Sequence, residues 1–195
     1  MKKINVFLSG LFLTLLLVGN SFSQSNKTDL LGYQEFTWGS SRNTVESILK
    51  KQKSKIISSK KSEIEIESKI EINDFPSSIN VTKRFFFVNN AFANVVVMYN
   101  KSISITRTKR IYDNFFSQLN KKYGVADQDS IIDKGTVLVR FSVWKFKSGH
   151  ILLRSIELSE DSALKEIENV SIVYANKDLT EKEEKDREKK ILNEF

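Results

Sequence analysis

The 195-residue chain contains no cysteine, one histidine and one proline. Without cysteine it can form no disulfide bond and carries no thiol for an N-terminal lipid. A single histidine without cysteine argues against a structural zinc site and against a typical catalytic one. No Gly-x-Ser-x-Gly segment is present, so the sequence offers no nucleophile next to a base and an orienting group.

Carboxylates are the remaining groups that could carry acid–base chemistry. Asp127, Asp129 and Asp133 fall in what we expect to be one polar loop, which lacks the ligand spacing of a calcium loop. Phosphate-binding and dinucleotide-binding glycine motifs are also missing. We therefore assign no catalytic residue, metal ligand or cofactor, and the sequence favours a non-catalytic protein. A carboxylate-based hydrolase is the alternative.

The first residues have the pattern of a signal peptide. Lys2 and Lys3 precede an almost wholly apolar run over 4–18, and small residues at Ser21 and Ser23 would permit cleavage before Gln24. The run is shorter than the ~20 apolar residues that a membrane-spanning helix needs, although an uncleaved anchor is the alternative. We expect 1–23 to be removed and the mature protein to be exported, periplasmic or extracellular.

Positive charge exceeds negative charge by seven, yet the basic residues are spread along the chain among acidic ones. This interleaving is typical of a solvated surface, and we expect no specific nucleic-acid binding. Electrostatic binding to an anionic envelope polymer is a further alternative. The oligomeric state stays open.

Hydrophobic periodicity predicts two amphipathic helices. The first begins after Ser40 or Ser41, which can cap it, and runs to about Lys51. The second ends before Gly124, a suitable C-terminal glycine. Its apolar stripe is wide enough to cover a sheet and comprises Ile111, Tyr112, Phe115, Phe116, Leu119 and Tyr123.

The rest of the chain alternates with period two. We expect strands at 63–72, 79–88, 92–99, 137–147, 150–158 and 169–175, and a weaker one at 55–59. The fold class is therefore α+β: an antiparallel sheet of about six or seven strands in two helix-then-meander units, with both helices on one face. We expect a flexible lead-in over 24–34, one domain over 35–176, and a charged, polar C-terminal helix or tail over 177–195.

The segment Trp38-Gly39-Ser40-Ser41-Arg42-Asn43-Thr44-Val45 resembles the opening motif of small exported bacterial domains. Similarity of element order continues through Tyr123-Gly124, a strand containing Trp144, and a Ser-Gly turn. These domains include the outer-membrane assembly lipoproteins of the SmpA/OmlA type and the β-lactamase-inhibitor-like repeats. This chain lacks their Gly-x-Pro and lipid-bearing cysteine. The resemblance implies a non-catalytic scaffold whose sheet face binds another protein.

We expect Val137, Val139, Phe141 and Val143 to face the helices. The opposite side of the strand would then expose arginine beside aromatic rings, a composition enriched at protein interfaces. The candidate residues for binding another envelope protein are Arg84, Phe86, Arg140, Trp144, Phe146 and Arg154. The alternative is that a third layer covers these aromatic rings.

Overall fold

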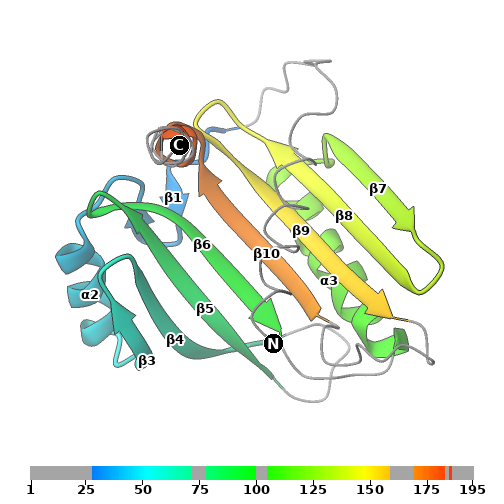
Figure 1. Ribbon diagram of the computed structural model, residues 1–195, viewed down its shortest axis with the longest axis horizontal. Helices are drawn as coiled ribbons and strands as arrows, with labels where there is room; N and C mark the ends of the chain where they lie inside the picture. The colour runs from blue at the N-terminus through cyan, green and yellow to red at the C-terminus, as the bar shows by residue number, and fades with distance from the viewer. Residues whose placement is uncertain (1–27, 72–77, 100–104, 159–168, 183–184, 186–195) are drawn as a thin grey trace, which may run out of the picture.

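The computed structural model describes residues 28–71, 78–99, 105–158, 169–182 and 185. Its elements, shown in Figure 1, are β1 (Gly32–Tyr33), β2 (Phe36–Thr37), α2 (Arg42–Lys51), β3 (Lys55–Lys60), β4 (Glu63–Ile70), β5 (Ile79–Val88), β6 (Ala91–Tyr99), α3 (Ile105–Tyr123), β7 (Gln128–Asp133), β8 (Val137–Lys145), β9 (Gly149–Leu158) and β10 (Asn169–Asn176). A further helical segment covers 177–182.

Eight strands form one sheet in the order β3-β4-β5-β6-β10-β9-β8-β7, and every neighbouring pair is antiparallel. The predicted α+β class and antiparallel sheet are confirmed. One helix precedes each run of four strands, and the two runs meet where β6 pairs with β10. The predicted six or seven strands are too few, and a separate two-stranded hairpin, β1–β2, adds to the eight.

The strand that the sequence did not indicate is β7, which we had expected to be a polar loop. Its Asp129, Ile131 and Asp133 are exposed, and the residues between them are half-buried. Because β7 lies at the sheet edge, its backbone ladder with β8 holds it in place without a buried apolar face. A polar composition therefore hid a regular strand.

Both predicted helices form where their signals lie. The Ser41 side chain accepts a hydrogen bond from the backbone N–H of Thr44 and caps α2, whose Val45 and Leu49 are buried. Helix α3 ends at Tyr123, and Gly124 follows with a φ of 81°. A positive φ costs glycine little, which explains its place at this helix end.

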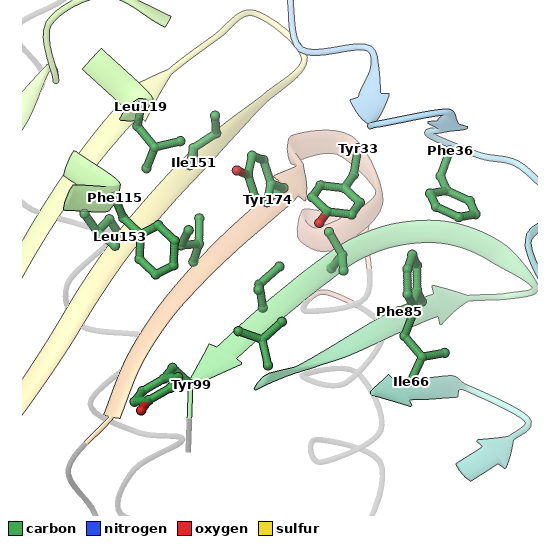
Figure 2. Packing of buried hydrophobic residues seen from close by; sticks show 14 of the residues in the cluster. Tyr33, Phe36, Ile66, Phe85, Tyr99, Phe115, Leu119, Ile151, Leu153 and Tyr174 are labelled. Carbon is green, nitrogen blue, oxygen red and sulfur yellow. The ribbon is translucent and has the colours of Figure 1, made fainter. Parts of the chain in front are cut away.

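The main core lies between the helices and one side of the sheet, which we call the helix face (Figure 2). Buried residues of α2, α3, the β1–β2 hairpin and the inward strand positions belong to a single cluster. Its members include Tyr33, Phe36, Leu49, Ile66, Phe85, Val97, Phe115, Leu119, Trp144, Leu153 and Tyr174.

The prediction for the two sides of β8 is wrong. Trp144 is 0 % exposed, and its indole N–H donates to the Gly124 carbonyl at 2.8 Å, just beyond the end of α3. The hydroxyls of Ser142 and Tyr112 are 2.6 Å apart. Helix α3 therefore covers the Trp144 side, while Val139 and Phe141 lie on the opposite face. The phase of Val139 and Phe141 is the more apolar of the two, so periodicity alone selected the wrong side.

The lead-in was predicted to be flexible over 24–34, but its residues from Asp29 onward are packed into the domain. We call 29–40 the strap. The Asp29 carboxylate accepts hydrogen bonds from the Ser148 N–H at 2.9 Å and the Ser148 hydroxyl at 2.7 Å. At the other end, the Gly39 N–H donates to the Phe92 carbonyl at 2.9 Å. The predicted signal peptide 1–23, residues 24–27, and 183–195 apart from Lys185 lie outside the described residues.

Replacing Trp144 tests this arrangement. Trp144→Ala removes a fully buried indole and leaves a cavity against α3, so we expect a loss of about 3–5 kcal/mol in the free energy of unfolding. Urea denaturation followed by circular dichroism measures it. As a control, Ile131→Thr alters a 60 %-exposed side chain on β7 and should change stability little. A Trp144→Ala protein as stable as the parent would contradict the burial of Trp144 under α3.

Candidate functional site

Two hollows open on the helix face, because α2 and α3 lie over different halves of the sheet (Figure 1). The lysine hollow, of about 540 Å³, is lined by Gln34, Phe36, Leu49, Gln52, Lys53, Ser54, Lys55, Ile66, Glu67, Ser68, Lys69, Asn80, Lys83 and Phe85. The tyrosine hollow, of about 500 Å³, is lined by Tyr33, Gln34, Lys69, Ile70, Glu71, Lys83, Val97, Phe115, Gln118, Leu119, Lys122, Tyr123, Ile172 and Tyr174.

Lys83 lines both hollows. It occupies an inward position of β5, in phase with the buried Val81 and Phe85. Its ammonium nitrogen lies 5.6 Å from the centre of the Tyr33 ring, within the range of a cation–π interaction. A lysine on the core side of a strand is unusual, because lysine is seldom buried unless it is paired.

Tyr33 and Tyr174 form the aromatic wall beside Lys83. Their ring centres are 4.9 Å apart, and Figure 2 shows them between Phe115 and Leu119 on one side and Phe36 and Phe85 on the other. Burial raises the pKa of both phenols above the ordinary value, so both hydroxyls stay protonated at neutral pH. The wall therefore offers apolar ring surface and neutral hydroxyl groups.

The electrostatics of the two hollows favour a negative ligand. Burial lowers the pKa of Lys83 below its ordinary value, although the carboxylate of Glu35 acts in the other direction. No ion pair joins Lys83 to any carboxylate in the described part of the chain. Five lysines and two glutamates line the hollows, and Glu67 is already paired with Lys55.

The six predicted partner-binding residues do not form one surface. Arg84, Phe86 and Arg154 lie on the opposite face of the sheet. Trp144 and Arg140 lie on the helix face, where α3 covers Trp144. Phe146 packs edge-on against Tyr123 of α3, with ring centres 5.7 Å apart. The six residues are therefore divided between two faces and do not form the single surface that we expected.

Two of the three arginines in this set have acidic neighbours within the fold. Arg140 pairs with Glu157 at 3.1 Å, and Arg84 lies 3.4 Å from Glu65. Glu157 is 5 % exposed, and burial raises its pKa despite the nearby guanidinium. Arg84 and Arg140 thus balance carboxylates of the protein itself.

The acidic residues near β7 have structural partners. Asp129 accepts from the Ser142 hydroxyl at 2.6 Å, and Asp127 accepts from the Lys145 N–H at 2.6 Å. His150, the single histidine, is half-buried, and burial lowers its pKa. Within the described ranges, no group of three His, Cys, Asp or Glu side chains could hold a metal ion.

Sequence reasoning missed Lys83, although a signal for it exists. In the alternating strand, Ile79, Val81, Phe85 and Phe87 share one phase, and Lys83 falls in the same phase. A charge at an apolar position of a strand indicates either a buried partner or an opening in the core. The hollows could be recognised only in the structure, because the residues that line them come from separate parts of the chain.

Comparisons with known proteins give no assignment: no protein-family model, curated protein or solved structure matches the chain. Among the described residues, no helix is both long and apolar enough to cross a membrane.

The half-buried charge of Lys83 predicts a pH-dependent stability difference. Because its folded-state pKa is lowered, Lys83 destabilises the fold below that pKa, and the penalty fades as pH rises towards the ordinary value of 10.5. We expect Lys83→Met to be more stable than the parent at pH 7, with a difference that narrows as the pH approaches 10.5. Urea unfolding of both proteins across this range measures the effect.

Lys121→Met provides the matched control, because Lys121 is exposed on α3 and lines neither hollow. Its stability should follow that of the parent at every pH. A Lys83→Met protein that is less stable than the parent at pH 7 would show that the Lys83 ammonium stabilises the fold.

Proposed function

We propose that the chain is an exported, non-catalytic binding protein that holds an anionic ligand in the two hollows, with Lys83 as the anchoring cation. The observation that carries the proposal is the half-buried Lys83 ammonium, which lies between aromatic and apolar walls without an ion pair among the described carboxylates. Binding sites are commonly concave, largely apolar and equipped with a few convergent polar groups.

The free-energy argument is one of desolvation. Removing an ammonium from water is unfavourable unless another group compensates its charge. A ligand carboxylate or phosphate beside Lys83 would supply that compensation. Lys53, Lys69 and Lys122 would add positive potential around the entrance, which raises the rate at which anions arrive.

A carboxylate-based hydrolase receives less support from the same residues. Such an enzyme needs two carboxyl groups that act on one bond. Each hollow is lined by a single glutamate, Glu67 in the lysine hollow and Glu71 in the tyrosine hollow, and Glu67 is paired with Lys55. The lining therefore favours binding over hydrolysis.

Membership of the exported domains that the sequence resembles stays a proposal, as does an envelope protein as partner. Arg84, Phe86 and Arg154 remain candidates for that contact on the opposite face. The resemblance implies the same class, a scaffold without catalysis, but places binding on a sheet face generally. Our proposal assigns ligand binding to the helix face because the hollows and Lys83 are there.

Export has its own test. If 1–23 is a signal peptide, protein recovered from the producing cell should begin at or within a few residues of Gln24. Mass spectrometry of the intact protein and of its N-terminal peptide measures this. Recovery of the full-length chain, with Lys2 and Lys3 present, in the membrane fraction would contradict the export part of the proposal.

The anchoring role of Lys83 can be tested with 8-anilinonaphthalene-1-sulfonate, an anionic dye that fluoresces in apolar sites. We expect saturable binding to the folded protein, and at least tenfold weaker binding by Lys83→Met, equivalent to about 1.4 kcal/mol. Lys121→Met should bind like the parent. Equal affinity of the Lys83→Met variant and the parent would overturn the proposed site.

A further inference from the structure

The two hollows share Lys83, Lys69 and Gln34 but differ in chemistry. The lysine hollow is lined by ammonium, amide and hydroxyl groups from the turn between α2 and β3 and from β3, β4 and β5. They are contributed by Gln52, Lys53, Ser54, Lys55, Ser68 and Asn80. A negatively charged, strongly hydrated group would find donors there.

The tyrosine hollow has the larger aromatic and aliphatic share, with eight of its fourteen lining residues against four of fourteen in the lysine hollow. Its floor comes from β6 and β10, and its walls come from α3 and the strap. The wall rings include Phe115, Tyr33 and Tyr174. Burial in this hollow would favour hydrocarbon, at roughly 25 cal/mol per Å² of apolar surface removed from water.

We infer that the ligand is an anionic amphiphile whose carboxylate or phosphate lies at Lys83 and in the lysine hollow, and whose hydrocarbon part lies in the tyrosine hollow. This inference rests on the proposed function and adds the class of ligand. Lys83 is the junction, because its side chain lines both hollows.

The asymmetry of the hollows distinguishes this ligand from two others. A small anion would leave the tyrosine hollow unused. A uniformly charged chain, such as an acidic peptide, could reach Lys69 and Lys122. It would also place charged groups against Val97, Ile172 and Phe115, where they would lose hydration. One charged end joined to an apolar body matches both hollows together.

The experiment compares three probes by isothermal titration calorimetry: dodecanoate below its micelle concentration, 1-dodecanol and acetate. We expect dodecanoate to bind at least a hundredfold more tightly than acetate, because burial of each methylene contributes about 0.8 kcal/mol at most. Dodecanol lacks the charge and should bind at least tenfold more weakly than dodecanoate.

Variants assign each part of the ligand to its hollow. Lys83→Met should weaken dodecanoate binding at least tenfold and leave dodecanol binding unchanged. Ile70→Asn places an amide in the tyrosine hollow and should weaken binding of both long-chain probes. Lys83→Gln repeats the charge test with a polar side chain, Lys121→Met is the control, and circular dichroism confirms the fold of each variant.

The outcomes separate this inference from the proposed function. If the dye binds in a Lys83-dependent manner but dodecanoate binds no better than acetate, the amphiphile is excluded and the anion site stands. If hexaglutamate displaces the dye and dodecanoate does not, the ligand is an acidic chain and the inference is overturned. If neither the dye nor dodecanoate depends on Lys83, both proposals fail.

Discussion

The antiparallel pairing of β6 with β10 is the constraint on which the site depends. Six residue pairs, from Val170 opposite Tyr99 to Ala175 opposite Asn94, join two four-stranded meanders into one sheet. Their apolar sides thereby become one continuous floor. Each helix precedes its own meander and packs over its own half of the sheet. The seam between the halves, where β6 pairs with β10, is therefore lined by residues from other elements as well. The tyrosine hollow has Val97 of β6 and Ile172 of β10 on its floor.

The strap completes this arrangement from outside the sheet. Asp29 is bound to Ser148, in the turn of the second meander, while Gly39 is bound to Phe92, near the turn of the first. A segment held at both ends by different meanders has little freedom between them, so Tyr33 is fixed against Tyr174. The strap held in this way also contributes Tyr33, Gln34 and Phe36 to the lining of the hollows.

The sequence predicted the elements better than their surroundings. Local patterns were sufficient for α2, α3 and most strands, because a cap, an apolar stripe or an alternation is written within a few residues. They were insufficient for β7, whose backbone ladder needs no apolar face, and for the orientation of β8. There, Arg140 and Ser142 looked like outward residues, yet on the helix face Arg140 pairs with Glu157 and the Ser142 hydroxyl is hydrogen-bonded to that of Tyr112. The alternation of β5 marks Lys83 as a charged residue at an apolar position. It gives no indication of the hollows beside Lys83.

Arg140 and Lys83, two cations on the helix face, differ in whether the fold supplies a carboxylate for the charge. Where α3 covers the sheet, the fold supplies a carboxylate, and Arg140 lies 3.1 Å from Glu157. Where the helices leave the seam open, Lys83 has the Tyr33 ring and, across the described residues, no ion-paired carboxylate. Both side chains carry the cost of desolvation, but only the first has its compensation within the protein. Under the proposed function, the ligand supplies that compensation for Lys83, and Lys83 is then the residue where stability and binding are expected to oppose each other.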